Sequence, residues 1–402
     1  MNQSNAREIR SQFGTQAKTA DQERSTCWSY IMRLLTPVCF IGLSVVAVVS
    51  VVLAGASGRV TGSALPIDRD DDADLLQQAR SLFKPLPKDM ATAEFPVAPA
   101  RVRLGRMLFF DPRISADGTG SCVRCHQPAL FGADGLPGSL GLHDKQLPRN
   151  APTVFNAALY TSEHWDGQFA NVEAQAKTAL LGPGFGNPDF ATAMARVTAI
   201  PGYASLFQQA FPGEAQPISE DNWGKAIGAY ERTLVSPSRF DDYLGGKSDA
   251  LSTAERTGLR TFIETGCVDC HNGTGIGGTT FRKFGVASDY WKATGSKEVD
   301  KGRFGVTNDP ADLYKFKVAG LRNVAMTPPY FHDGVVEGLP KAVRIMAKVQ
   351  LDTDLADAEI DQIVTFLGSL TGSLPEGFER APVLPPGGFG QPSSDSSRSQ
   401  TR

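Results

Sequence analysis

Two short cysteine-containing segments stand out as sites of chemistry in this chain. Residues 122–126 read CVRCH and residues 267–271 read CVDCH, so both follow the pattern Cys-x-x-Cys-His. Two thiols one helical turn apart can add across the two vinyl groups of one haem, and the adjacent histidine can then bind the iron. A thioredoxin-like pair or half of a zinc site fits less well, because both pairs carry the immediate histidine and no further cysteines complete a zinc site. We therefore predict two covalently bound haem c groups, attached through Cys122, Cys125, Cys267 and Cys270 and ligated by His126 and His271.

Each haem iron has a second axial position, and the ligand there decides what the haem does. Three histidines remain, His143, His164 and His332, and the methionines after the second motif are Met326 and Met346. A thioether stabilises ferrous iron and raises the reduction potential, whereas a second histidine lowers it. A methionine on an amphipathic helix is more often a core residue than a ligand. Spacing alone therefore leaves both sixth ligands open.

The elements that must hold these residues are predicted to be mostly helices. An amphipathic segment precedes each motif, at residues 102–110 and 255–263, which indicates a repeated cytochrome c unit. Further helices are expected at residues 189–199, 219–234, 339–350 and 355–371. Strand-like alternation is scarce, and 41 glycines and 26 prolines indicate long irregular loops. The fold class is therefore mostly α, with two cytochrome c-like domains that each wrap one covalently bound haem.

An apolar segment near the N-terminus indicates the compartment. Residues 31–56 are almost wholly apolar and follow Arg24, so we expect a membrane anchor with its N-terminus in the cytoplasm. The segment also ends in Ala54-Gly55-Ala56, a pattern that signal peptidase cleaves, and a cleaved signal peptide is the alternative. Either outcome exports the remainder to the periplasm. The net charge of −3 and the lack of a basic run argue against nucleic acid as a partner.

These patterns divide the chain into six predicted parts. They are a cytoplasmic leader (1–30), the anchor or signal peptide (31–56), a flexible linker (57–74), an N-terminal haem domain (75–235), a C-terminal haem domain (236–384) and a disordered tail (385–402).

From Leu104 to about Thr371 the chain resembles bacterial di-haem cytochrome c peroxidases and the related MauG-type enzymes. The matching stretches are LFFDPRIS, PRNAPTVFNAA, HWDG, AYERTLVSPSRFD, CHNG, KFGV, DKGRF and FKVAGLRNVAMTPPYFHDG. The resemblance implies a low-potential first haem that reacts with hydrogen peroxide and a high-potential second haem where electrons enter. A small c-type cytochrome or copper protein is the implied electron donor, and relatives are commonly homodimers.

The same resemblance implies roles for individual residues. Met346 matches the distal ligand of the second haem, and Trp165 matches the tryptophan that lies between the haems. Asn150, with the carbonyl groups of Thr327 and Pro329, matches a calcium site at the domain junction, and oxygen ligands of this kind suit calcium. His332, in YFHDG, is interpreted as a structural residue near the domain interface.

The sequence departs from the family pattern at two positions around the first haem. The family's removable distal histidine aligns with Leu142, and we expect the next residue, His143, to take its place. The family's acid–base glutamate aligns with Phe185, and no carboxylate occurs between Glu173 and Asp189. Losing such a group slows a reaction by about 10²–10⁴-fold. His164 is a candidate to replace this glutamate or to serve as a sixth ligand, because histidine does both at neutral pH.

Three functions are therefore weighed. The leading one is a periplasm-facing oxidoreductase that reduces hydrogen peroxide to water. The first alternative is a MauG-type enzyme that oxidises residues of a partner protein; MauG-type enzymes carry tyrosine in place of the distal methionine, so Met346 argues against it. The second is a non-enzymatic electron-transfer or sensor protein, for which the absence of the glutamate would be natural.

Overall fold

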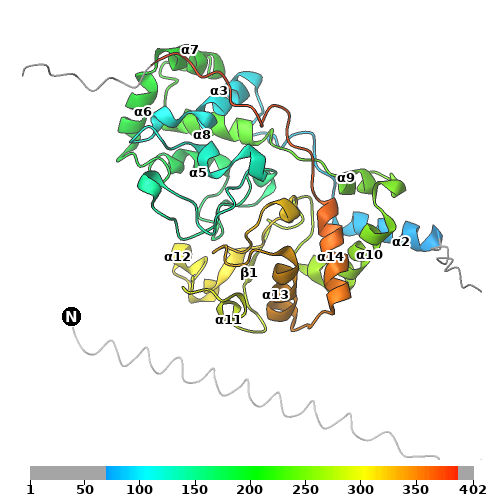
Figure 1. Cartoon of the computed structure of the whole chain (residues 1–402). Helices are drawn as coiled ribbons and strands as arrows, with labels where there is room; N and C mark the ends of the chain where they lie inside the picture. The colour runs from blue at the N-terminus through cyan, green and yellow to red at the C-terminus, as the bar shows by residue number, and fades with distance from the viewer. Residues whose placement is uncertain (1–68, 388–402) are drawn as a thin grey trace, which may run out of the picture. The chain divides into compact units, whose positions relative to one another are not determined.

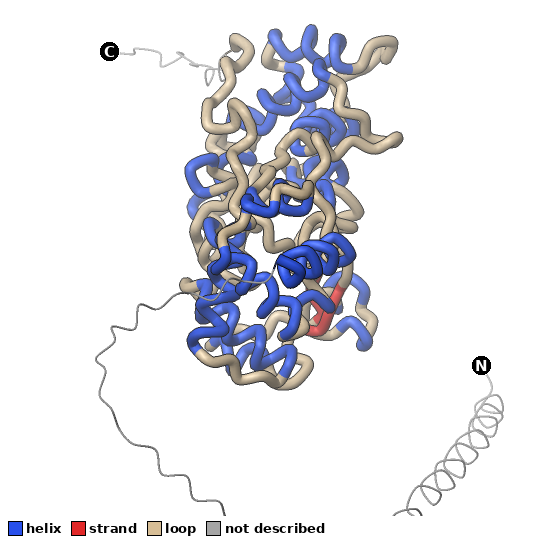
Figure 2. The backbone as a smooth tube through the Cα atoms, turned by 90° about the vertical axis from the view of Figure 1, so that its right-hand side faces the viewer, coloured by secondary structure: helices blue, strands red, loops and turns tan. Residues whose placement is uncertain are grey.

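The computed structural model describes residues 69–387, and this part of the chain is mostly helical (Figure 1). Its α-helices are α2 Arg69–Leu82, α3 Pro99–Phe110, α4 Cys122–Cys125, α5 Val172–Ala179, α6 Phe190–Thr198, α7 Pro201–Ala210, α8 Glu220–Glu231, α9 Arg239–Leu244, α10 Thr253–Glu264, α11 Tyr290–Thr294, α12 Phe304–Thr307, α13 Leu339–Leu351 and α14 Asp357–Ser369. Two short strands, β1 (Phe281–Lys283) and β2 (Lys315–Lys317), pair antiparallel with Phe281 opposite Lys317. The mostly α fold class is confirmed, and long loops connect the helices (Figure 2).

All six helices expected from periodicity are present, as α3, α6, α8, α10, α13 and α14. Several short helices were missed, among them α5 and α7. The local signal for α5 is the side chain of Asn171, which accepts a hydrogen bond from the amide of Ala174 and so caps the helix. For α7 it is Pro201, which occupies the first helical turn directly after α6.

The helices form two main hydrophobic cores. The first core contains residues of α3, α5, α6, α7 and α8, with Trp223 and Phe207 fully buried. The second core contains residues of α2, α9, α10 and α14, with Phe240 and Phe366 fully buried. A smaller cluster around Phe316 joins β2 to α11 and α13. Figure 1 shows the helices of the two main cores as separate groups.

The first half of the described chain carries the first core and the first cysteine motif, and the second half carries the second core and the second motif. The helix before each motif is packed in the same way in both halves. Gly105 of α3 lies against the main-chain carbonyl of Ala226 in α8, and a side-chain Cβ there would collide with it. Gly258 of α10 lies in the same manner against the carbonyl of Gln362 in α14. Glycine lets two helix backbones approach closely, because it has no Cβ. The two predicted repeat segments therefore have equivalent packing.

Both ends of the described chain cross to the other half. Leu75 and Ala79 of α2, and Phe83 directly after it, are spaced four residues apart and pack in the second core. Phe378 packs in the first core, and Arg106 donates a hydrogen bond to the carbonyl of Gly377 at 2.6 Å. The start of the predicted N-terminal domain and the end of the predicted C-terminal domain therefore each place apolar side chains in the opposite core.

Two boundaries differ from the prediction. Residues 69–74 belong to helix α2, so the flexible linker does not extend to residue 74. At the other end, Arg113 donates hydrogen bonds to the carbonyls of Pro385 and Gly387 at 3.1 and 2.6 Å, so residues 385–387 are held against the fold. The predicted leader and anchor, and the tail beyond residue 387, lie outside the described residues. Between residues 69 and 387, no helix is both long and apolar enough to cross a membrane.

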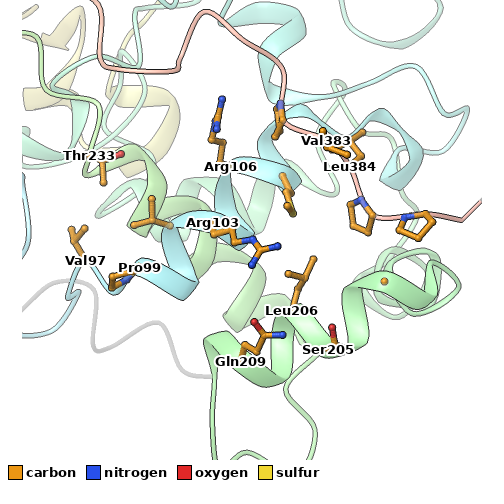
Figure 3. Close-up of a pocket in the computed structure, with 16 residues that line it drawn as sticks. Val97, Pro99, Arg103, Arg106, Ser205, Leu206, Gln209, Thr233, Val383 and Leu384 are labelled. Atoms are coloured by element: carbon orange, nitrogen blue, oxygen red, sulfur yellow. The ribbon is translucent and has the colours of Figure 1, made fainter.

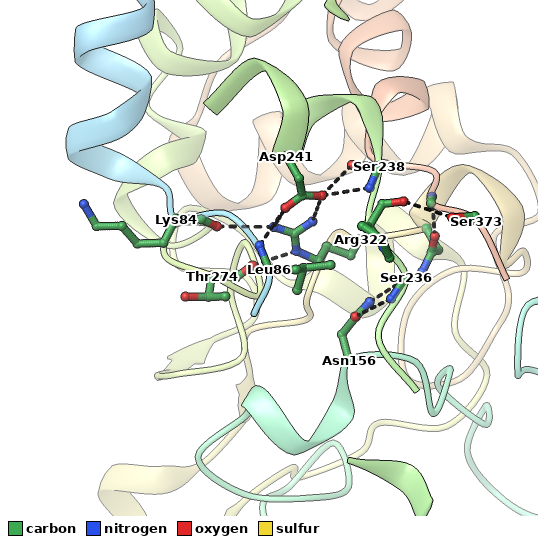
Figure 4. A network of polar contacts seen from close by, with 12 residues as sticks. Lys84, Leu86, Asn156, Ser236, Ser238, Asp241, Thr274, Arg322 and Ser373 are labelled. Atoms are coloured by element: carbon green, nitrogen blue, oxygen red, sulfur yellow. Dashed lines mark hydrogen bonds and ion pairs between the residues drawn. The ribbon is translucent and has the colours of Figure 1, made fainter. Parts of the chain in front are cut away.

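A buried polar network joins the two halves (Figure 4). The amide groups of Asn156 and Asn323 each donate a hydrogen bond of 2.8 Å to the hydroxyl of Ser236, which lies between α8 and α9. Both asparagines have a positive φ, and each precedes a short 3₁₀ helix, Ala157–Leu159 or Val324–Met326. One serine therefore ties together two equivalent turns from the two halves.

Beside this serine, a second set of contacts holds the segment that follows α2. Arg322 is fully buried and binds both carboxylate oxygens of Asp241 at 2.9 Å. Arg322 also donates to the main-chain carbonyls of Thr274 and Lys84. The pKa of Asp241 is lowered; burial acts to raise it, but the guanidinium of Arg322 and further hydrogen bonds outweigh that effect. This ion pair fixes the segment after α2 against the second half.

Candidate haem sites

The first cysteine motif occupies a single helical turn, α4. The amide of His126 donates to the carbonyl of Cys122 at 3.0 Å, which closes the turn, and His126 Nδ1 lies 3.0 Å from the carbonyl oxygen of Gly132. A protonated Nδ1 that donates to this carbonyl leaves Nε2 free to bind a metal. Burial lowers the pKa of His126, which keeps the imidazole neutral as a ligand requires.

The second motif follows α10 and has equivalent geometry. The amide of His271 donates to the carbonyl of Cys267 at 3.0 Å, and His271 Nδ1 lies 3.1 Å from the carbonyl oxygen of Ala319. Burial lowers the pKa of His271 to about 4. All four motif cysteines are free thiols, and burial raises the pKa of Cys122, Cys125 and Cys267. Both motifs therefore present two unpaired thiols and an oriented, neutral imidazole, which fits a covalently attached haem.

A cavity of about 280 Å³ opens beside the second motif. Its wall includes Cys267, Cys270 and His271, together with Met346 from the middle of α13. Val343 and Ala347 of the same helix also line it, as do Phe262 and Leu367. A thioether that faces the same apolar cavity as the motif histidine can act as the opposite axial ligand. The structure therefore brings together the four residues predicted for the second haem.

Trp165 also lies on the wall of this cavity, in a loop held from several sides. Its indole Nε1 donates to the carbonyl of Asn150 at 2.9 Å, and its own carbonyl accepts from the amide of Lys317 at 2.7 Å. Next to it, Asp166 binds Arg149 at 2.5 Å, and Arg149 also pairs with Asp300 at 2.7 Å. Charged groups from both halves therefore fix this tryptophan beside the second motif.

The segment from Asn150 to Thr153 is a wall between the two motifs. It lines the cavity of the second motif, and the backbone of Pro152 within it acts on the pKa of His126 in the first motif. The hydroxyl of Thr153 donates to the carbonyl of Phe131 at 2.5 Å, next to Gly132, the partner of His126. A short stretch of chain therefore contacts both candidate haem sites.

Comparison with known proteins identifies the chain. Residues 99–249 match the family model for di-haem cytochrome c peroxidase. Cytochrome c551 peroxidase of Pseudomonas aeruginosa is 41% identical over 313 residues, which is 77% of this chain and 90% of that protein. The chain belongs to the di-haem cytochrome c peroxidase family. It is accordingly an oxidoreductase whose family carries two c-type haems.

Relatives of the MauG type are also similar. Methylamine utilization protein MauG of Methylorubrum extorquens is 35% identical over 246 residues, 61% of this chain and 67% of that protein. A solved structure, described as a MauG-like protein associated with microbial copper homeostasis, shares 29% identity at a TM-score of 0.64. The match covers 74% of this chain and 96% of that one. The di-haem family thus spans peroxidase and MauG-type members on one fold.

The residues predicted to bind calcium meet at the same cavity. Asn150, Thr327 and Pro329 all line it. The Asn150 side chain donates from Nδ2 to the carbonyl of Leu136 at 2.8 Å, which directs its amide oxygen away from that contact. No group of three or more His, Cys, Asp or Glu residues in the described part of the chain could hold a metal ion. The donors here are amide and carbonyl oxygens, which is the ligand type that calcium uses.

The loop predicted to supply the sixth ligand of the first haem has an unexpected orientation. Leu142 is buried, and its side chain packs closely against Gly120 and Gly186. The side chain of His143 is 84% exposed, and its Nδ1 lies 3.9 Å from Asp117. The residue that points inward is therefore the leucine that aligns with the family's histidine. His143 therefore does not take the place of the family's distal histidine in this structure, contrary to expectation.

Phe185 occupies an apolar environment. Its ring is 4% exposed and packs edge-on against Trp223, with the ring centroids 5.9 Å apart. Its carbonyl accepts a hydrogen bond from the amide of Ala116 at 2.8 Å. The nearest preceding carboxylate in the sequence, Glu173, is held by both oxygens on Arg232 at 2.7 and 2.9 Å. Glu173 is therefore committed to a buried ion pair and does not substitute for the missing glutamate.

The two remaining histidines lie near the second motif. His164 has a positive φ, packs edge-on against Phe169 at 4.7 Å between centroids, and lines the cavity with Cys267 and His271. His332 is buried and stacks on Phe316 at 4.3 Å, and its carbonyl accepts from the amide of Asn150. These contacts agree with the structural role expected for His332. His164 shares a cavity wall with the second motif, whereas its predicted role was at the first.

A second hollow of about 960 Å³ lies away from the predicted residues (Figure 3). It is formed by α3, α7 and the C-terminal segment, including Arg103, Leu206 and Val383. None of the cysteines, histidines or methionines of the two candidate haem sites line it. It therefore takes no part in the candidate chemistry.

Sequence analysis missed the charged residues of the main cavity wall, among them Glu163 and Lys317. Lys317 is flanked by Phe316 and Val318, both buried, and an apolar setting of this kind is the only local sign of a buried lysine. Its partner Glu163 is more than 150 residues away in the sequence, so the pair emerges only from the fold.

Proposed function

We propose that this chain is a periplasm-facing di-haem cytochrome c peroxidase that reduces hydrogen peroxide to water with electrons from a small c-type cytochrome or copper protein. The observation that carries the proposal is the cavity that combines Cys267, Cys270, His271 and Met346 with Trp165. The family supports the reaction class, since relatives named cytochrome c peroxidases match most of the chain.

Two cytochrome c-like domains, each wrapping one haem, are part of this proposal. The haems, when bound, supply the iron that stores electrons and reacts with peroxide. Cys122 and Cys125 would hold the first and Cys267 and Cys270 the second, with His126 and His271 as proximal ligands. Met346 would hold the sixth position of the second haem and favour its reduced state. Trp165, on the wall of the second cavity, would offer an aromatic ring between the two haems.

A calcium ion at Asn150, Thr327 and Pro329 is also proposed. The Asn150 carbonyl already accepts the indole proton of Trp165, so an ion held by Asn150 would stiffen the contact that orients the tryptophan. Removing calcium with a chelator should then change the fluorescence or near-ultraviolet dichroism of Trp165. The residues of the proposed ion site and the tryptophan share one wall of the cavity.

The acid–base step lacks its usual carboxylate, and His164 is the candidate that the sequence offers in its place. Its pKa is lowered by desolvation, opposed by the nearby Asp166 carboxylate, so the imidazole is neutral and able to accept a proton at pH 7. Its position on the second cavity favours a supporting role there over direct contact with peroxide. His164→Ala should therefore leave the absorption spectrum of the first haem unchanged.

The alternatives are a MauG-type oxidation of a partner protein and a non-enzymatic electron-transfer or sensor protein. The buried Phe185 favours the second of these, because an apolar ring cannot move a proton between peroxide oxygens. Met346 on the cavity wall argues against the first.

One experiment separates these functions. The purified half-reduced protein, with calcium and a reduced c-type cytochrome, is mixed with peroxide, and donor oxidation is followed alongside the Soret band. Turnover supports the peroxidase. A first haem that stays six-coordinate and does not react with peroxide or cyanide would contradict it and favour electron transfer or sensing. Peroxide-dependent oxidation of a partner protein without donor turnover would support the MauG-type enzyme.

The compartment and the assembly complete the proposal. The apolar segment at residues 31–56 supports export to the periplasm, with retention as an anchor or removal as a signal peptide. The mass of the mature protein distinguishes these two outcomes, and light scattering tests for a homodimer.

A further inference from the structure

A buried ion pair lies on the wall of the main cavity. Lys317 Nζ is 3.5 Å from Glu163 Oε2, and the two side chains are only 9% and 11% exposed. The same ammonium group donates to the carbonyl of Ser162 at 2.5 Å and lies 4.8 Å from the centre of the Tyr160 ring. Charged side chains are rarely buried to this degree unless they are paired. The pair is therefore a built feature of the cavity.

The pair is incompletely neutralised by its surroundings. Glu163 Oε1 is buried and has no hydrogen-bond partner. Burial raises the pKa of Glu163 to about 7, although Lys317 acts to lower it, and burial lowers the pKa of Lys317. Both side chains line the cavity that also contains Cys267, Cys270, His271 and Met346. Each charge of the pair therefore acts on the same apolar space that the second motif faces.

The pair is also connected directly to the bridging tryptophan. The amide of Lys317 donates to the carbonyl of Trp165 at 2.7 Å, and Glu163 lies two residues before Trp165. The amide of Glu163 in turn donates to the carbonyl of Phe169, which closes the loop that carries the tryptophan. Lys317, the last residue of strand β2, therefore contributes a charge to the cavity and a backbone hydrogen bond to the loop that carries Trp165.

We propose that the Glu163–Lys317 pair sets the reduction potential of the second haem and positions the Trp165 loop. The inference rests on the proposed function in that a haem is bound at the second motif. An ammonium group close to the cavity stabilises the extra electron of the reduced state, and a carboxylate destabilises it. Removing one partner leaves the other charge uncompensated in a buried site, so the two single changes have opposite effects.

The test compares three variants with a matched control. Lys317→Met, Glu163→Gln and the double variant are purified with both haems. Each haem is titrated spectroelectrochemically at pH 8, above the pKa of Glu163 in the unmodified protein. We expect Lys317→Met to lower and Glu163→Gln to raise the potential of the second haem. The reduction equilibrium should change at least about tenfold in each, or about 59 mV for one electron. The double variant should return close to the unmodified protein.

Lys315→Met is the control, because Lys315 lies on the same strand, pairs with Asp312 at 3.1 Å, and is not part of the cavity wall. Shifts of the same sign, or shifts no larger than that of the control, would overturn the inference. If Lys317→Met fails to retain haem, the upward shift in the nearly isosteric Glu163→Gln decides alone. The potentials are measured without peroxide, so a protein that lacks peroxidase turnover still tests this inference, and opposite shifts would support it even then.

Discussion

The two candidate haem sites begin with equivalent local geometry and differ in what surrounds them. In both, the motif histidine turns Nδ1 towards a backbone carbonyl, and a glycine lets the preceding helix cross closely over another. The second site adds Met346 and a charged pair on one cavity wall. At the first, the positions that align with the family's distal histidine and glutamate are the buried Leu142 and Phe185. The second half thus carries the residues that the resemblance implies, whereas the first half carries apolar residues at two of the aligned positions.

From this difference we infer that haem attachment and peroxide chemistry depend on separate residues. Attachment needs only the local motif and an oriented imidazole, and both halves provide these. Peroxide cleavage needs a proton carrier placed by the fold, and the first half presents a phenyl ring at that position. Substitutions that exchange features between the two halves can therefore break or sharpen the comparison.

The largest effect is expected from restoring a carboxylate at the first site. Phe185→Glu should raise peroxide turnover by about 10²–10⁴-fold, the range associated with a general acid–base. The measurement is steady-state oxidation of a reduced c-type cytochrome. Phe185→Gln is the control, since it has similar shape and cannot exchange a proton. Equal rates in both variants would show that the acid–base step is not what separates this chain from its peroxidase relatives.

The next largest effect is expected from giving the second haem the axial ligand of a low-potential haem. Met346→His should lower the potential of the second haem by at least about 100 mV, because axial ligands set haem potentials over about 0.8 V. Electron entry from the donor should slow accordingly. Redox titration measures this, and an unchanged potential would mean that Met346 is a core residue only. Met326→Leu is the control, since Met326 is exposed and lies outside the cavity wall.

Removal of the Ser236 hydroxyl should weaken the junction between the two halves. Ser236→Ala removes the hydroxyl that accepts from both Asn156 and Asn323, so two buried amide donors lose a partner. At about 1–3 kcal/mol for each of the two unsatisfied groups, the free energy of unfolding should fall by about 2–6 kcal/mol. Urea denaturation measures the change. Ser373→Ala, at an exposed serine, should cost less than about 0.5 kcal/mol.

The buried carboxyl of the second cavity predicts a pH dependence. Because the pKa of Glu163 is raised to about 7 in the folded state, its neutral form contributes stability that is present below its ordinary value of 4.5. That contribution is lost as the pH rises through 7, and it amounts to at most about 3 kcal/mol. Glu163→Gln should therefore flatten the stability profile between pH 4.5 and 7. A steeper profile in the variant would contradict the raised pKa.

The smallest effect is expected at the exposed loop of the first site. His143→Ala should leave the spectrum of the first haem unchanged, because the His143 side chain is 84% exposed. Leu142→His places an imidazole on the buried side of the same turn and should shift the spectrum to that of a bis-histidine haem. A changed spectrum in His143→Ala would instead show that this histidine reaches the iron, as the sequence first suggested.

The sequence alone was sufficient for the features that depend on neighbouring residues. The two motifs, the helices that precede them and the amphipathic α13 with Met346 all follow from short-range spacing. The departures at Leu142 and Phe185 were also visible, because they are single positions within recognisable stretches.

The tertiary structure decided what depends on contacts between distant residues. It placed α2 in the second core and Phe378 in the first, turned Leu142 inward and His143 outward, and put His164 on the second cavity. It also joined Glu163 to Lys317, and Asn156 to Asn323 through Ser236. Burial of a side chain and the pairing of charges are set by the whole packed chain, so no local pattern of residues could have shown them.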